Sequence, residues 1–114
     1  MSSESEQARR RAHEVFDPIA EGYLTREGVD MGRMFSTEGL RVRGKVFACV
    51  TSRGELMLKL PAARIDGLAA AGTAERVVMR ERAMREWVAV DVAHATDWAP
   101  LVGEAFAFLD EITP

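Results

Sequence analysis

Hydrophobic and polar positions follow a helical period near both ends of the chain and a period of two in between. Before residue 25, apolar side chains recur every three or four positions, opposite a charged stripe. These apolar positions are Ala8, Ala12, Val15, Phe16 and Ile19. We predict a helix from about Ser3 to about Leu24, with a kink or restart at Asp17-Pro18, because proline lacks an N–H and clashes with the preceding turn.

Between about residue 29 and residue 91 the alternating pattern is typical of strands. The predicted strands lie near residues 32–36, 40–43, 45–51, 55–60, 75–79 and 86–91. Gly44 and Gly54 separate neighbouring strands, where a tight antiparallel turn requires a positive φ. We therefore predict antiparallel pairing in sequence order, as in a meander, with a loop over residues 80–85.

Two more helices are expected. Pro61 followed by AARIDGLAAAG predicts a short helix that ends at Gly72. A second apolar stripe begins after Asp97, a good N-cap residue, and runs to about Ile112. A chain of 114 residues forms one core rather than two. We predict a single α+β domain over residues 1–114, with an antiparallel sheet of about five to six strands and three helices.

Several stretches between Asp30 and Leu109 carry a family likeness: GRMF, GLRVRGKVFACV, ELMLKLPAARIDGL, MREWVAVD and DWAPLVGEAFAFL. The most specific elements are the triplet Arg33-Met34-Phe35, Gly44 followed by Phe47, and the strand Met84-Arg85-Glu86-Trp87-Val88. In these stretches the chain resembles the amino-terminal domain of the TfoX/Sxy competence regulators. The resemblance implies an α+β sandwich of two layers, akin to YjbR-like and secretion-chaperone-like domains. It carries over no catalytic residue.

Composition narrows the class of protein. The chain is 47% hydrophobic and 29% charged, which is ordinary globular usage. Its single cysteine, Cys49, cannot form an internal disulfide and agrees with a reducing compartment. The apolar runs are too short to span a bilayer. We expect a cytoplasmic protein that makes no membrane contact.

Candidate catalytic groups are few. Cys49 could act as a nucleophile only with a base such as His13 or His94, but a lone cysteine in an alternating strand is usually a packed residue. Two histidines and one cysteine supply no zinc-binding spacing, and no phosphate-loop motif occurs. We therefore predict a protein that is not an enzyme and that needs no metal or cofactor.

Charge is distributed unevenly along the chain. Residues 26–85 hold twelve basic and seven acidic residues, whereas residues 86–114 hold six acidic and no basic residues. Pairing within the chain and ordinary solvated charge account for this pattern without any partner. The uneven charge indicates that the sheet is basic, but by itself it does not indicate a bound ligand.

Strict alternation divides the predicted sheet into two faces. One face is aliphatic and suits a core beneath the helices. The other, which we call the mixed face, combines apolar and basic side chains and carries the candidate partner-binding residues: Lys45, Phe47, Met57, Lys59, Arg85 and Trp87. Such a surface is too apolar for bare solvent, so we expect the N-terminal helix, a second copy of the chain or a ligand to cover it.

We interpret the chain as a non-enzymatic TfoX-like binding or interaction module that self-associates as a homodimer, or binds another protein, through the sheet. One alternative is a nucleic-acid-associated regulatory domain. The basic sheet favours it, but a pI near 5.4 and the lack of a recognition motif oppose it. Another alternative is a small-molecule-sensing domain with a pocket between the sheet and the helices.

Overall fold

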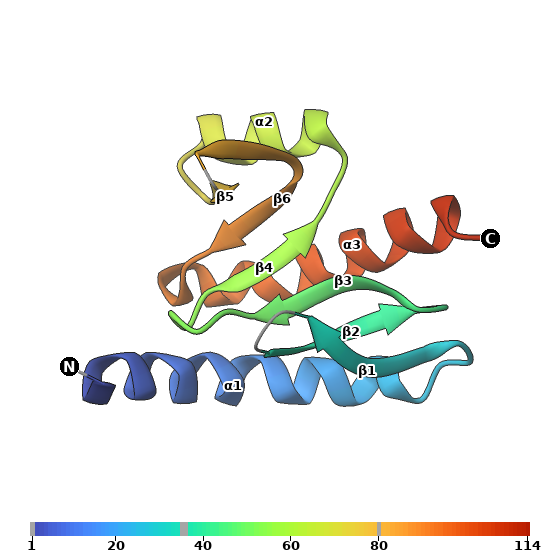
Figure 1. Cartoon of the computed structure of the whole chain (residues 1–114), viewed down its shortest axis with the longest axis horizontal. Helices are drawn as coiled ribbons and strands as arrows, with labels where there is room; N and C mark the ends of the chain where they lie inside the picture. The colour runs from blue at the N-terminus through green and yellow to red at the C-terminus, as the bar shows by residue number, and fades with distance from the viewer. Residues whose placement is uncertain (1, 35–36, 80) are drawn as a thin grey trace.

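The computed structural model describes residues 2–34, 37–79 and 81–114. This part of the chain forms three α-helices, a short 3-10 helix and six strands (Figure 1). In chain order they are α1 (Ser2–Leu24), β1 (Val29–Met34), β2 (Thr37–Val42), β3 (Lys45–Val50), β4 (Leu56–Lys59), α2 (Ala62–Ala70), β5 (Glu75–Met79), β6 (Arg82–Val90), η1 (Val92–Asp97) and α3 (Trp98–Ile112). The predicted α+β class, with an antiparallel sheet and three helices, is confirmed.

All six strands belong to one antiparallel sheet with the order β1-β2-β3-β4-β6-β5. Pairing follows the chain as far as β4, as the predicted meander requires. Beyond β4 the prediction is wrong, because β6 rather than β5 lies beside β4. Helix α2 carries the chain past this position to the outer edge, and the β5–β6 hairpin then brings it back.

The β5–β6 hairpin is tighter than the predicted loop over residues 80–85. Strand β6 already begins at Arg82, and Glu81 has the positive φ of a turn residue, 63°. Arg80 lies outside the described residues. Charged side chains are common in a hairpin at a sheet edge, where they remain in solvent, so this charged run does not require a loop.

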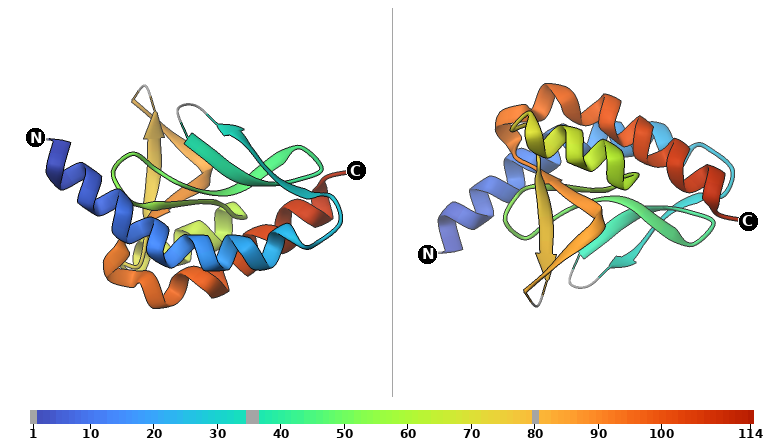
Figure 2. Two further views of the ribbon diagram at one scale, coloured as in Figure 1. Left: turned by 90° about the horizontal axis from the view of Figure 1, so that it is seen from below. Right: turned by 90° about the horizontal axis from the view of Figure 1, so that it is seen from above.

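The three α-helices cover the same face of the sheet (Figure 2). In both views of Figure 2 the helices lie to one side, and the β1–β2 and β5–β6 hairpins project to the other. One continuous cluster of buried side chains joins the two layers. Its largest fully buried members are Trp98, Phe16, Phe47, Leu40, Leu56, Leu58, Leu60 and Ile65.

Helix α1 continues through Pro18, without the predicted restart at Asp17. Pro18 lies on the exposed side of the helix, whereas Phe16 and Ala20 are buried. The Glu14 carbonyl, which receives no hydrogen bond from proline, can therefore bond to water instead. Among the described residues, neither this helix nor any other is both long enough and apolar enough to cross a bilayer.

The start of α3 is organised by an earlier aspartate than predicted. Asp97 occupies the N-cap position but makes no side-chain cap hydrogen bond. Asp91 Oδ1 instead accepts a hydrogen bond from the Ala93 N–H at 2.8 Å and so caps η1. The Trp98 Nε1–H donates to the Asp91 carbonyl at 3.2 Å, which ties the first turn of α3 to the end of β6.

Candidate binding face

The sheet face opposite the described helices is buried at its centre. Cys49 is fully buried and Met57 is 7% exposed, yet neither belongs to the core beneath the helices. The two residues are partners across β3 and β4, so their side chains share a face, while the neighbouring Ala48 points into the core. We call this the helix-free face. Alternation along β4 and β6 places Lys59 and Trp87 on it as well.

Part of the predicted mixed face is present here. Lys59 and Trp87 are partners across β4 and β6, and Lys59 Nζ lies 5.8 Å from the centroid of the Trp87 ring. The same Nζ is 4.0 Å from Glu86 Oε1. Arg85 is exposed two residues before Trp87 in β6. The structure thus brings Met57, Lys59 and Trp87 together, whereas Arg85 lies in the stretch of β6 where the pairing with β5 is irregular.

A bulge in β3 reverses the face of the residues before Ala48. Leu40 of β2 pairs with Ala48. The next residue, Arg41, pairs with Val46 rather than Phe47. Phe47 is therefore the extra residue of the bulge, and it turns towards the helices while Val46 turns away. The prediction that Phe47 lies on the mixed face is wrong, because strict alternation fails at a bulge.

Phe47 is a core residue that joins three elements. It is fully buried, and its ring centroid lies 5.9 Å from that of Tyr23 in α1 and 5.5 Å from that of Phe106 in α3. The Arg26 guanidinium covers this group, 4.9 Å from the Tyr23 ring centroid and 4.8 Å from that of Phe106. Phe47 therefore has no exposed surface with which to contact a partner.

Lys45 also leaves the predicted mixed face. It pairs with the buried core residue Val42, directly beside the Arg43-Gly44 turn, and directly opposed residues share a face. Lys45 is exposed at the end of the sheet. The bulge that reverses Phe47 thus reverses Lys45 too, so the prediction for Lys45 is wrong for the same reason.

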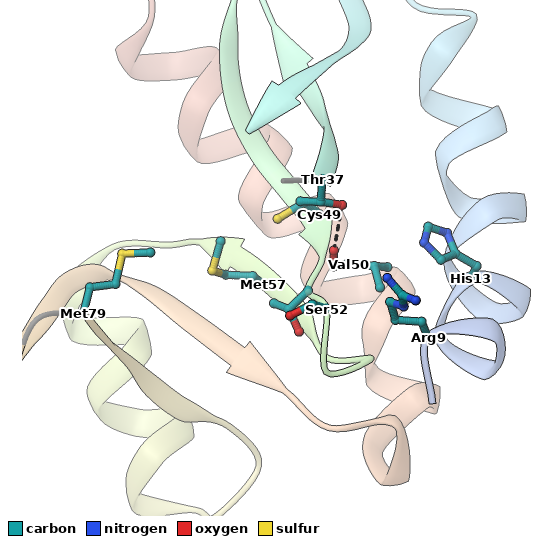
Figure 3. A pocket seen from close by; sticks show the side chains of 9 residues that line it. Arg9, His13, Thr37, Cys49, Val50, Ser52, Met57 and Met79 are labelled. Carbon is teal, nitrogen blue, oxygen red and sulfur yellow. Dashed lines mark hydrogen bonds between the residues drawn. The ribbon is translucent and has the colours of Figure 1, made fainter. Parts of the chain in front are cut away.

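A hollow of about 300 Å³ lies on the helix-free face (Figure 3). Its floor contains Cys49 and Met57, with Thr37 of β2 at one side and Met79 of β5 at the other. Strands β2 and β5 are separated in the sheet by β3, β4 and β6. Residues from both strands reach one cavity because the sheet is strongly twisted and curved. This curvature makes the helix-free face concave.

The polar rim of the hollow comes from α1 and from the turn between β3 and β4. The rim residues are Arg9, His13, Thr51 and Ser52. Gly54 holds these two segments together, since a Cβ there would meet the Ala8 backbone and its φ is +81°. Glycine at this position allows the turn to touch α1. The contact brings the hydroxyls of the turn next to the basic side chains of the helix.

Arg9 gives the rim of the hollow its positive charge. None of the described lining residues is acidic. Arg9 takes part in none of the ion pairs formed between described residues. His13 Nδ1 lies 2.9 Å from Asp17 Oδ1, one turn further along α1. A carboxylate only accepts, so Nδ1–H donates to Asp17 and this hydrogen bond orients the ring.

The thiol of Cys49 is not activated. Desolvation by burial raises its pKa to about 12, so the thiol is protonated near neutral pH. In Figure 3 its sulfur points towards Met57 and Met79, and the His13 ring lies at the far end of the hollow. Among the described residues, no group of three or more His, Cys, Asp and Glu side chains could hold a metal ion.

Two acidic side chains of α3 form ion pairs with arginines from other parts of the chain. The Arg64 Nε–H and Nη2–H donate to Glu104 Oε1 and Oε2 at 2.8 and 3.1 Å. The Arg43 Nη1–H donates to Asp110 Oδ1 at 2.9 Å. The first pair joins α2 to α3 within the helix layer, and the second joins the β2–β3 turn of the sheet layer to α3, so at these positions the uneven charge is compensated within the chain.

Sequence reasoning did not find the rim or the far end of the hollow. Arg9 belongs to the charged stripe of the first predicted helix, His13 was considered only as a base for Cys49, and Met79 ends a predicted strand without a stated role. Their meeting depends on the curvature of the sheet and on the contact between Gly54 and α1, which alternation along single strands does not reveal. The local signal that was available is the glycine of the β3–β4 turn, which marks a close backbone approach.

No family model, curated protein or solved structure matches the chain. The resemblance to the TfoX/Sxy amino-terminal domain therefore stays a prediction from the quoted residues, and Phe35 of its triplet lies outside the described residues. The helix-free face and its hollow are the features of the chain that bear on its function.

Proposed function

We propose that the protein is a non-enzymatic, TfoX-like binding module whose helix-free face is its binding surface. The hollow of about 300 Å³ is the observation that carries this proposal. It has an apolar floor and a few convergent polar groups at one end, the combination that is typical of ligand sites. The three α-helices pack mainly on the opposite face. The N-terminal part of α1 extends past the sheet and supplies Arg9 and His13 to the rim, and the hollow stays open.

Binding without catalysis is supported by the state of the groups in the hollow. Nucleophilic catalysis by cysteine requires a thiolate and a base within hydrogen-bond reach. Cys49 is a neutral, buried thiol whose sulfur points away from His13. Cys49 has no exposed surface, so it closes the base of the hollow, while Met57 supplies apolar surface there.

Self-association is a second candidate, favoured by an exposed apolar side chain at a sheet edge. Strand β5 is an edge strand, and Val78 within it is 63% exposed. The open backbone of an edge strand can pair with a second copy of the chain. Nucleic-acid binding has weaker support, because Arg41 on the helix-free face is already paired with Asp30 at 2.6 Å.

Nuclear magnetic resonance titrations of the labelled full chain test the proposed function. The probes are a set of small anionic, cationic and neutral fragments, short single-stranded and duplex oligonucleotides, and the protein itself in a dilution series. We expect amide shift changes to cluster at Thr37, Cys49, Ser52 and Met57. Changes confined to the helix layer, or no change with any probe, would show that the helix-free face is not a binding surface.

A further inference from the structure

We propose that the hollow binds a small organic carboxylate with a short linear apolar tail, whose head lies at Arg9 and His13 and whose tail lies on Met57 and Met79. This inference rests on the proposed function, because the hollow is part of the helix-free face. It adds the chemical class of the ligand and the direction in which the ligand lies.

The head of the ligand is placed by the charge at one end of the hollow. Arg9 and His13 are four residues apart on α1, so their side chains lie on the same face of the helix. Figure 3 shows both at the same end of the hollow, with Ser52 between them and the methionines. A guanidinium presents paired donors that match a carboxylate, and none of the described lining residues would repel an anion.

The tail is placed by the apolar character of the opposite end. Met57 and Met79 lie there with the Cys49 sulfur directed towards them (Figure 3). Thioether side chains are flexible and polarizable, and they adapt to linear alkyl chains. A charged group at this end would lose its hydration without gaining a partner, so the ligand must be amphipathic.

The size of the ligand follows from the volume of the hollow. A volume of about 300 Å³ corresponds to about ten water molecules, each of which occupies about 30 Å³ in the liquid. A ligand with about ten non-hydrogen atoms therefore fits, and octanoate is a suitable probe. Acetate is too short to reach the methionines, and a long-chain fatty acid exceeds the hollow.

Isothermal titration of the full chain with octanoate tests this inference. We expect saturable binding that weakens about tenfold in Arg9→Gln, the effect of losing one charge-assisted hydrogen bond. Arg10→Gln is the matched control, because Arg10 is the neighbouring exposed arginine of α1 and does not line the hollow. It should leave the affinity within about twofold, as a surface charge outside the site does.

The tail is tested by a second matched pair in β5. Met79→Gln places a polar group against the tail and should weaken octanoate binding, whereas Val78→Gln alters an exposed neighbour outside the hollow and should not. Octanamide, octylammonium and acetate should each bind more weakly than octanoate. Amide spectra of all four variants must match that of the native protein, so that altered folding does not account for a loss.

Three results would overturn the inference: no binding of octanoate, equal effects of the two arginine variants, or equal binding of octanoate and octylammonium. If octanoate fails while other fragments or a second copy of the chain shift the amides of the helix-free face, the carboxylate assignment is wrong and the proposed function stands. If no probe shifts those amides, both are wrong.

Discussion

At Gly39 the backbones of β2 and β3 approach so closely that no side chain fits. A Cβ there would lie 2.8 Å from Val46 Cγ1 and 3.0 Å from the Ala48 carbonyl oxygen. These two residues flank Phe47, and Gly39 itself pairs with Cys49, so the glycine lies next to the bulge that turns Phe47 into the core. An isolated glycine inside a strand often marks such a bulge, and here it is the sequence signal that strict alternation ignores.

Replacing Gly39 by alanine should therefore destabilise the protein. We expect a loss of about 1–3 kcal/mol, the usual cost of overpacking a site whose neighbours are backbone and β-branched side chains. Urea denaturation would measure it. Gly32→Ala is the matched control, because a Cβ there meets mainly the flexible Arg41 side chain. If both variants unfold at the same urea concentration, close packing at the bulge is not the cause.

Cys49 gives a residue-scale prediction about reactivity. Its pKa is raised from 9.0 to about 12 by burial, so below pH 9 the folded protein should hold about a thousandfold less thiolate than an unfolded chain. Iodoacetamide should label Cys49 at least that much more slowly in buffer than in concentrated urea. Because the thiolate fraction grows with pH until it reaches the pKa, the native labelling rate should still rise above pH 9. Rapid native labelling at neutral pH would show an activated thiol.

At the scale of elements, the sequence predicted whether each segment is a helix or a strand more accurately than it predicted which strands lie side by side. Helical and alternating periods identified the three helices and most strands, because each period reflects one buried stripe or face. The pairing of β4 with β6 was not predictable. No local sequence signal shows whether the strand that follows α2 lies next to β4 or at the outer edge of the sheet. Lys45 and Phe47 were misplaced by a bulge, and the hollow was missed because it needs the curvature of the whole sheet.

The β2–β3 turn and the last residues of the chain form one unit through Arg43. Its guanidinium donates to the backbone carbonyls of Asp110, Thr113 and Pro114 at 2.9, 2.7 and 3.1 Å. Arg43 itself has φ 47°, next to Gly44 with φ 86°, which is the backbone of a tight hairpin turn. A single side chain thus anchors the end of the helix layer to the sheet layer.

Arg43→Lys should loosen this anchor while keeping the positive charge. A lysine ammonium cannot reproduce the fork of guanidinium donors, so we expect a loss of about 1 kcal/mol and faster amide exchange at the last residues of α3. Hydrogen exchange followed by mass spectrometry would measure both. Arg53→Lys, in the exposed β3–β4 turn, serves as the control. Unchanged exchange near Asp110 in Arg43→Lys would mean that the observed bonds add no protection.

In the molecule as a whole, the side chains that form the core lie between the helices and the sheet, whereas the proposed binding surface lies on the other, concave side of the sheet. One continuous core joins the helices to the sheet. The helix-free face contains buried residues that belong to no such core, including Cys49 and Met57. Changes on this face can therefore alter binding with a smaller effect on folding than changes beneath the helices.

This separation makes two charge reversals informative about self-association. If copies of the chain meet through the helix-free face, Lys59→Glu should shift the monomer–dimer equilibrium, because Lys59 lies on that face beside Trp87. Lys45→Glu should leave the equilibrium unchanged, since the bulge places Lys45 on the other side. Sedimentation velocity over a dilution series would measure the equilibrium. Equal shifts in the two variants would point to overall charge, and a native protein that is monomeric throughout would rule out self-association through this face and through the β5 edge alike.

The placement of the two tryptophans has an optical consequence. Trp98 is fully buried beneath the helices, while Trp87 is partly exposed on the helix-free face with a lysine over its ring. Collisional quenchers such as iodide should reach Trp87 and leave Trp98 bright, and variants that lack one tryptophan would assign each emission. The chain thus carries its own pair of fluorophores, so that occupancy of the concave face and integrity of the interior can be followed separately in one unlabelled sample.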